Sequence, residues 1–333
     1  MSVTTLAREI RGLIEGLRVR PRTADIVAEK VVSKPWARIG VHAGDVLLLL
    51  PPAEGNLPKN VELERLSVRF NVACIVEQKG KRRDESLVIA RMLAPSPSTL
   101  DAFIDIVAVV LCRLRAYEPR SVSSSILTLA ELFESLNEPP SKTLHGLFGE
   151  LVVIGDSSDV DLAAASWHAT PTDLHDFSHG TVRVEVKATC GQRQHIFSYE
   201  QLRPVRGISV VIASVLLESH PKGDTIPELL DQICGRLRSP EVAACVTRQA
   251  VRCLGDGWHA ASEARFALAG GRRAVRFYAA KDVPCVKPPP FGVSQVKFKA
   301  DLQMVPASNT TRLRALGPLA KAIIQPSSLE LVP

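Results

Sequence analysis

The sequence predicts a mixed α/β fold, α+β overall, and three observations support this prediction. Hydrophobic residues make up 46% of the 333 residues and charged residues 23%, the balance of a folded globular protein. Some segments repeat apolar residues with the period of a helix, whereas others alternate apolar and polar residues as strands do. The composition excludes a disordered, collagen-like or coiled-coil chain, and the length predicts two domains, or one large domain with additions.

Charge and cysteine content narrow the possible partners and environment. The chain has 41 basic and 35 acidic residues, a net charge of +6, which permits a nucleic-acid partner without requiring one. Aromatic residues are 5%, too few for single-strand binding by rows of stacked bases. The seven cysteines form no C-x-x-C pair, which argues against a common structural zinc site and a disulfide framework. Without a signal-peptide pattern or a membrane-length apolar run, we expect a cytoplasmic protein with no membrane partner.

Residues 1–138 are predicted to form a β-rich and helical module for targeting or partner binding. Two strand-like runs flank a polar turn at 79–84, and Ser98 is a suitable N-cap for a long helix. The elements predicted here are a helix over 2–17, strands over 46–50, 66–77 and 86–91, and helices over 100–117 and 123–136. Asn137 and Glu138 then lead into Pro139-Pro140, a pair that marks a domain boundary.

Residues 139–220 are predicted to form the core domain, and residues 221–333 an α+β extension that completes or flanks it. Ser141 can cap a helix that runs through Val152, and residues 168–180 are predicted as a loop with a short strand. The remaining predicted elements are strands over 181–189 and 208–217, helices over 225–237 and 240–252, and strands over 264–269, 274–279 and 293–302.

The strand over 181–189 carries the residues that point to chemistry. Its valines share one face, so Glu185 and Lys187 share the other with Arg183. Charged groups set between apolar elements are costly to bury unless something compensates them. Asp176 lies far enough upstream to stand on the neighbouring strand of a short hairpin. Two carboxylates suit Mg²⁺, and a nearby lysine can orient an attacking water, which together indicate metal-assisted phosphodiester hydrolysis.

A second acid-x-lysine tripeptide, Glu77-Gln78-Lys79, serves as a useful contrast. It lies at a strand end that runs into a Lys/Arg turn, and no aspartate followed by an apolar residue precedes it closely. We therefore interpret it as a solvated hairpin tip.

The order helix acid, strand acid, strand acid-x-Lys and helix resembles the PD-(D/E)XK nuclease superfamily, in particular a bacterial branch known from genome context near restriction and phage-defence genes. The segments that carry the resemblance are Gly146–Leu151, Trp167, Asp176-Phe177, Val184–Thr189, His195–Leu202 and the stretch from Tyr278 to Phe298. The resemblance implies a restriction-endonuclease-like core with a central mixed β-sheet flanked by helices. The proline that usually precedes the metal-binding aspartate is replaced by His175, so Asp173 is an alternative to Asp176.

The resemblance also implies roles for particular residues. Asp176 and Glu185, helped by the Val186 carbonyl, would hold Mg²⁺, with Mn²⁺ as a possible substitute. Glu150 would complete the acidic cluster, and Lys187 would position water. His195 and Gln201 would contact phosphate or hold the active-site helix.

The implied function is a Mg²⁺-dependent endodeoxyribonuclease, a phosphodiesterase of the type II restriction kind, that acts on double-stranded DNA. Its setting would be a bacterial restriction or phage-defence system with operon-encoded partners such as an ATPase, a methyltransferase or targeting subunits. The chain has no nucleotide-binding glycine loop of its own, so any ATP-driven motion must come from such a partner. A homodimer is plausible because duplex cleavage needs two active sites or two visits. The alternative is a non-catalytic DNA-binding or scaffold subunit built on a decayed nuclease core.

Rival interpretations concern three other sets of residues. The first set contains possible zinc ligands, but their spacing fits no common zinc pattern. The second is a Cys190–His195 nucleophile pair, which has no orienting group nearby. The first helix presents arginines that could meet DNA phosphates or simply face solvent. The possible zinc ligands are His168, His175, His179 and Cys190, and the arginines are Arg8, Arg11, Arg18, Arg20 and Arg22.

Overall fold

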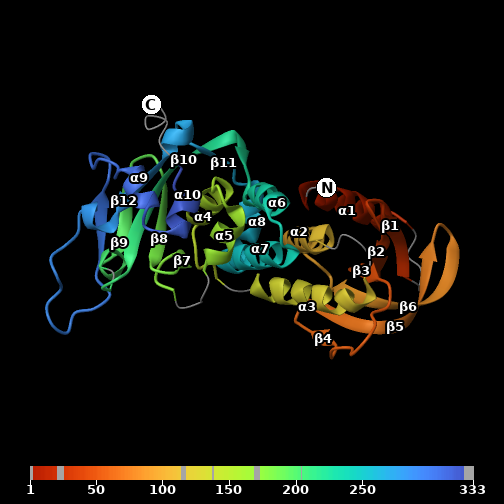
Figure 1. The fold of residues 1–333 in the computed structure, drawn as a ribbon. Coiled ribbons are helices and arrows are strands. Elements are labelled where there is room, and N and C mark those ends of the chain that lie inside the picture. The colour runs from red at the N-terminus through yellow and green to blue at the C-terminus, as the bar shows by residue number, and fades with distance from the viewer. Residues whose placement is uncertain are drawn as a thin grey trace. The chain divides into compact units, whose positions relative to one another are not determined.

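The computed structural model describes residues 3–20, 26–113, 118–136, 139–168, 173–203 and 205–325. The chain divides into two compact units, one of Met1–Pro140 with Leu254–His259 and the other of Ser141–Cys253 with Ala260–Pro333. Figure 1 shows helices and mixed sheets along the chain, so the predicted mixed α/β class is confirmed. Apart from residues 254–259, the predicted C-terminal extension falls in the same unit as the predicted core.

The first unit is built on a sheet with the strand order β1-β2-β3-β6-β5-β4, in which an additional parallel pairing of β1 with β5 joins the sheet to itself. Helix α1 packs against β1, β2 and α2 through the face that carries Leu6, Ile10, Ile14 and Leu17. The elements are α1 (Val3–Arg18), β1 (Ile26–Val31), β2 (Lys34–His42), β3 (Asp45–Leu50), β4 (Val61–Glu62), β5 (Leu66–Gln78), β6 (Lys81–Met92), α2 (Pro97–Arg113) and α3 (Pro119–Ser135).

Two local predictions for the first unit are wrong. The β5–β6 hairpin turns at Lys79-Gly80 alone, both with positive φ, and β6 already begins at Lys81, so the polar turn does not extend to residue 84. Helix α2 begins at Pro97, so Ser98 lies within the helix and not at its N-cap position, and the Ser96 hydroxyl accepts from the Thr99 backbone N–H. Polar residues on a two-stranded ribbon still pair through their backbone, which polarity alone does not reveal. The predicted end of this helix near Tyr117, and the predicted boundary at 138, lie outside the described residues.

The larger sheet of the second unit has the order β11-β10-β8-β7, with β12 also paired to β10, and β9 and β13 form a separate two-stranded sheet. Strands β8 and β10 are parallel from Val182–Ser209 to Cys190–Leu217, and β7 is antiparallel to β8. The elements that follow Pro140 in the chain, where residues 254–259 belong to the first unit, are α4 (Leu144–Gly155), α5 (Val160–Ser166), β7 (Phe177–His179), β8 (Val182–Cys190), β9 (Gln194–Ser198), η1 (Glu200–Leu202), β10 (Ser209–Asp224), α6 (Ile226–Arg236), α7 (Pro240–Leu254), η2 (Gly255–Gly257), α8 (Trp258–Glu263), β11 (Phe266–Leu268), η3 (Gly271–Ala274), β12 (Val275–Ala279), η4 (Ala280–Asp282), β13 (Lys297–Asp301), α9 (Thr310–Arg314) and α10 (Pro318–Ile323).

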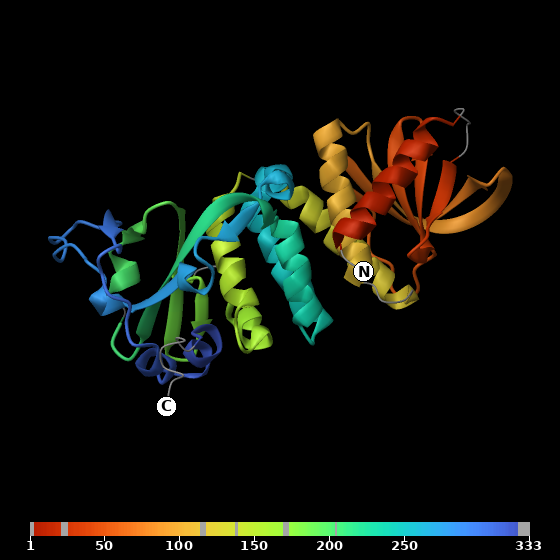
Figure 2. The ribbon, with the colours of Figure 1, turned by 90° about the horizontal axis from the view of Figure 1, so that it is seen from above.

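Helix α4 lies directly on β8, and Figure 2 shows it between the sheet and α6. A Cβ atom at Gly149 would come within 2.5 Å of the Ala188 Cβ, so the glycine permits this close approach. Thr143, not the predicted Ser141, caps the helix by accepting from the Gly146 backbone N–H. The contact with β8 fixes the position of Glu150, the residue after Gly149, relative to the strand.

One further prediction for the second unit is wrong, and one helix has no counterpart among the predicted elements. The segment after β9, expected to begin a helix, forms only the short 3₁₀ turn η1, and Pro204 and Gly207 follow it in the sequence. Proline removes a backbone donor and disfavours a continuing helix. Helix α5 was not predicted. None of the helices within the described ranges has both the length and the apolar character needed to cross a membrane.

Candidate active site

Three carboxylates of the predicted site lie on separate segments of the second unit. Glu150 lies on α4, Asp176 directly precedes β7, and Glu185 lies on β8. All three are buried, with 3%, 7% and 3% of their surfaces exposed. Buried carboxylates are costly unless hydrogen bonds or cations compensate them, so the partners of each one decide what the cluster can do.

Asp176 is fixed to β8 by its own side chain. Its Oδ2 accepts the backbone N–H of Val186 at 2.8 Å, and its Oδ1 accepts from Lys142 Nζ at 2.6 Å. Its backbone carbonyl accepts from the N–H of His168 at 2.8 Å. These bonds hold the aspartate beside the strand that carries Glu185.

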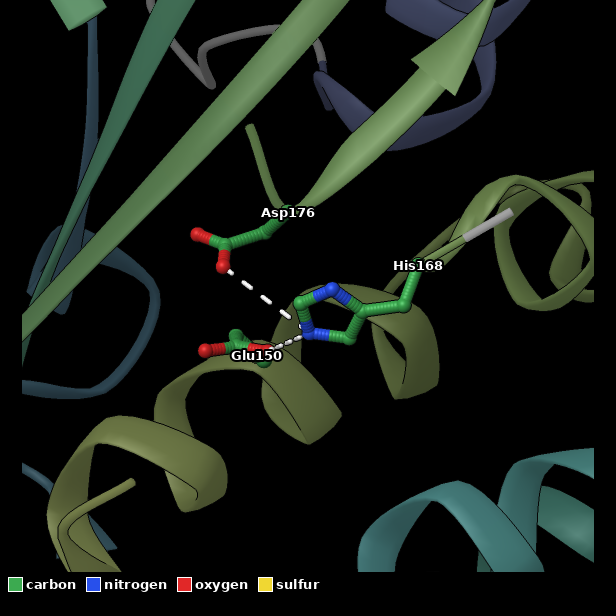
Figure 3. A group of neighbouring side chains, drawn as sticks. All are labelled: Glu150, His168 and Asp176. Atoms are coloured by element: carbon green, nitrogen blue, oxygen red, sulfur yellow. Dashed lines mark hydrogen bonds and ion pairs between the residues drawn. The ribbon is translucent and has the colours of Figure 1, made fainter. Parts of the chain in front are cut away.

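Glu150 shares Lys142 and His168 with Asp176. Its Oε2 accepts from Trp167 Nε1 at 2.8 Å and lies 3.1 Å from His168 Nε2, and its Oε1 pairs with Lys142. Figure 3 shows the His168 ring directed at both carboxylates. The side chains of Glu150, His168 and Asp176 each offer one possible metal-ligand atom, all within 4.8 Å of one another.

This compact group differs from the set predicted from the sequence. Among the residues that the structure describes, Glu150, His168 and Asp176 form a group whose possible metal-ligand atoms all lie within 4.8 Å of one another. It contains His168, which entered the sequence analysis only as a possible zinc ligand, and it does not contain Glu185. Mixed oxygen and nitrogen donors are compatible with divalent cations.

Glu185 is compensated on one oxygen and not on the other. Its Oε1 accepts from Lys187 Nζ at 2.7 Å and from Gln201 Nε2 at 2.5 Å. Its Oε2 is buried and has no hydrogen-bond partner within the described part of the chain. Burial, followed by the charge of Asp176, raises the pKa of Glu185 to about 8. An orphaned carboxylate oxygen beside a second carboxylate fits a divalent cation, which would supply the missing compensation.

Lys142 is the cationic partner that the sequence analysis missed. Burial alone would lower the pKa of its ammonium group, but the charges of Glu150 and Asp176 together raise that pKa above its ordinary value. The lysine stands just before α4, in a segment with no periodic pattern. Nothing local in the sequence marks it, because its partners come from α4 and from the approach to β7.

His195 and Gln201 have different surroundings. The ring of His195 is buried, its Nε2 lies 2.8 Å from Ser214 Oγ, and burial with the charges of Lys187 and Arg193 lowers its pKa to about 4. The imidazole is therefore neutral near pH 7. Gln201 bonds Glu185 and also accepts the Ser198 backbone N–H at 3.0 Å. This geometry makes Gln201 a positioning residue for Glu185.

His175, which stands where the family pattern has proline, makes a tertiary contact. Its Nε2 lies 3.0 Å from the Gln201 carbonyl oxygen, and burial lowers its pKa. The alternative aspartate, Asp173, is not part of the compact group. His179 and Cys190 are exposed, and the four possible zinc ligands form no common group among the described residues.

Two of the arginines predicted to meet DNA phosphates pair with acids of the first unit. Arg11 pairs with Asp101, and Arg20 Nη2 lies 2.8 Å from Glu29 Oε1. Arg22 lies outside the described residues.

Comparison with known proteins gives the family. Searches among curated proteins and among solved structures found no match to this chain. One family model matches residues 22–303, which is most of the chain and includes Glu150, Asp176, Glu185 and Lys187. The chain therefore belongs to the family described as "Putative PD-(D/E)XK family member" (DUF4420).

Proposed function

We propose that this protein is a metal-dependent phosphodiesterase that hydrolyses DNA, an endodeoxyribonuclease of the type II restriction kind. Family membership supports a nuclease-like fold. The observation that carries the proposal is Glu185, whose Oε1 is bound to Lys187 while its buried Oε2 lacks a partner among the described groups. A structural ion pair would satisfy both oxygens, whereas a metal ligand needs one of them available.

The proposal assigns a role to each residue of the cluster. Asp176 and Glu185, with the Val186 carbonyl and with Glu150, would hold Mg²⁺ or Mn²⁺, which supplies positive charge to stabilise the phosphate in the transition state. Lys187, held by Glu185, orients the attacking water. Gln201 holds the carboxylate of Glu185 in position.

The test uses the acid-x-lysine tripeptide of the first unit as a matched control. We expect Glu185→Ala and Lys187→Ala to lower Mg²⁺- or Mn²⁺-dependent plasmid cleavage on the order of a thousandfold. Glu77→Ala and Lys79→Ala, on the β5–β6 hairpin, leave cleavage unchanged. The assay includes the operon-encoded partners, and circular dichroism checks folding. Equal cleavage by the wild type and a folded Glu185→Ala variant contradicts the mechanism.

The setting of the activity follows from the family branch that the sequence resembles. We place the nuclease in a bacterial restriction or phage-defence system in the cytoplasm, acting on double-stranded DNA. Its partners would be operon-encoded ATPase, methyltransferase or targeting subunits, and a homodimer would supply one active site for each strand. The first unit would bind the target or a partner. Co-purification with the neighbouring gene products and light scattering test these assignments.

A second candidate, a non-catalytic DNA-binding or scaffold subunit, is favoured by one specific observation. Lys142 contacts both Glu150 and Asp176, so an internal ammonium group already compensates two of the three acids. This candidate predicts DNA binding that weakens with salt but does not respond to EDTA or to Glu185→Ala. Loss of binding on chelation contradicts it.

A further inference from the structure

Lys142 occupies the position between two of the acids that the proposed metal site uses. Its Nζ contacts Glu150 Oε1 and lies 2.6 Å from Asp176 Oδ1, and its side chain is 21% exposed. These two oxygens belong to the carboxylates of the compact group that also includes His168. An ammonium group and a divalent cation would therefore compete for the same carboxylates.

The backbone of Lys142 is anchored, so this contact is not that of a free surface side chain. The N–H groups of Ser141 and Lys142 donate to the Cys253 carbonyl oxygen at 3.0 and 3.2 Å. Thr143 then caps α4. The second unit begins at Ser141, and its first segment ends at Cys253. The lysine is thus held at its backbone, and only its side chain is able to leave the carboxylates.

The charge balance of the compact group requires a cation near Glu150 and Asp176. Two buried carboxylates this close together repel one another, and the described residues satisfy them with one ammonium group, an indole N–H, an imidazole and a backbone N–H. If a divalent cation supplies the charge instead, the ammonium group adds repulsion and must move out.

We propose that Lys142 is a built-in counter-ion that holds Glu150 and Asp176 together in the absence of metal and is displaced when a divalent cation binds. This inference rests on the proposed metal-dependent function and adds a residue that sets the affinity for the metal. The apparent affinity of a site falls with the fraction of molecules in which it is available. Lys142 therefore weakens metal binding and makes it depend on movement of one side chain.

The first test measures metal binding without any nuclease assay. Free Mn²⁺ is titrated by electron paramagnetic resonance into wild type, Lys142→Met and the control Lys281→Met, an exposed lysine on η4 of the same unit. We expect Lys142→Met to bind Mn²⁺ about tenfold more tightly than wild type, because the competing charge is gone, and Lys281→Met to bind as wild type does. Equal affinity in wild type and Lys142→Met overturns the inference and leaves the proposed function standing. Absence of Mn²⁺ binding in every variant overturns both.

The second test needs no variant, so it holds even if Lys142→Met does not fold. Wild-type protein is labelled briefly with an amine-acetylating reagent in EDTA and in Mn²⁺, and acetylation of each lysine is measured by mass spectrometry. We expect labelling of Lys142 to rise several-fold in Mn²⁺ while labelling of Lys281 stays constant. Labelling of Lys142 that does not change with Mn²⁺, in protein shown to bind the metal, overturns the inference.

Discussion

Asp45 on β3 and Glu185 on β8 are both buried carboxylates at sheet strands, one in each unit, but their surroundings differ. Both oxygens of Asp45 are hydrogen-bonded, Oδ2 to Arg91 Nε at 2.6 Å and Oδ1 to the Ala94 backbone N–H at 2.7 Å. Glu185 has two donors on Oε1 and, in the part of the chain that the structure describes, none on Oε2.

The Asp45–Arg91 ion pair stabilises the fold, whereas the Glu185–Lys187 pair leaves a carboxylate oxygen suited to bind a cation. The Asp45–Arg91 pair closes a complete set of hydrogen bonds at the edge of β3, as structural buried polar groups usually do. Glu185 retains an uncompensated oxygen and a raised pKa, a combination that is concentrated at functional sites. Burial alone therefore did not distinguish the two carboxylates, whereas the complete count of their partners does.

The largest expected effect is a difference in the free energy of unfolding between variants of Glu185 and Asp45 in metal-free protein. Because the pKa of Glu185 is raised from its ordinary 4.5 to about 8, the folded state binds more protons than the unfolded state between these values. The stability from Glu185 is fully present below pH 4.5 and is lost as pH rises through 8. Relative to wild type, Glu185→Gln should therefore gain free energy of unfolding on the order of 3 kcal/mol between pH 5.5 and pH 8.5.

Urea unfolding in EDTA at the two pH values measures this gain. Asp45→Asn serves as the opposing variant, since it weakens a satisfied pair and should lower the free energy of unfolding by about 2 kcal/mol at pH 8.5. If Glu185→Gln is as destabilising as Asp45→Asn at pH 8.5, the two carboxylates do not differ in the way that the structure indicates.

A smaller effect should come from the group that orients Glu185. Gln201→Ala removes the hydrogen bond to Oε1, and loss of such an outer contact typically costs about tenfold to a hundredfold in metal affinity or activity. Gln194→Ala is the matched control, because Gln194 Nε2 bonds the exposed carboxylate of Asp301 at 2.9 Å. Mn²⁺ titration of both variants measures the effect. Equal losses of Mn²⁺ affinity in Gln201→Ala and Gln194→Ala would show that the Gln201–Glu185 hydrogen bond matters no more than one on the surface.

The smallest effect compares helix glycines of the two units. Gly149→Ala brings a methyl group against Ala188, so we expect a net loss of about 1 kcal/mol in the free energy of unfolding. Gly12→Ala, on α1, meets no atom within 4 Å and should gain up to about 1 kcal/mol from better helix propensity. Thermal unfolding of both variants gives the signs. A stabilising Gly149→Ala would show that α4 is free to move away from β8.

Much of the fold could be predicted because its signals are local. The alternating residues of β8 marked Val182, Val184 and Val186 as one face, and these valines are buried in the structure. The apolar run over 208–217 predicted a buried strand, and most residues of β10 in this run are buried. Helix ends were less predictable, as Thr143 shows, since neighbouring polar residues in the sequence offer several possible caps.

The sequence by itself determined the strand faces, the helix that carries Glu150 and the acid-x-lysine element of β8. Each of these depends on residues within a few positions of one another, whose spacing is set by backbone geometry. Only the tertiary structure decided that Lys142 joins Glu150 to Asp176, that His168 enters their group and that Gln201 holds Glu185. These contacts join side chains from different segments, and the packing of α4 and β7 on β8 sets their distances without leaving a periodic pattern in the chain.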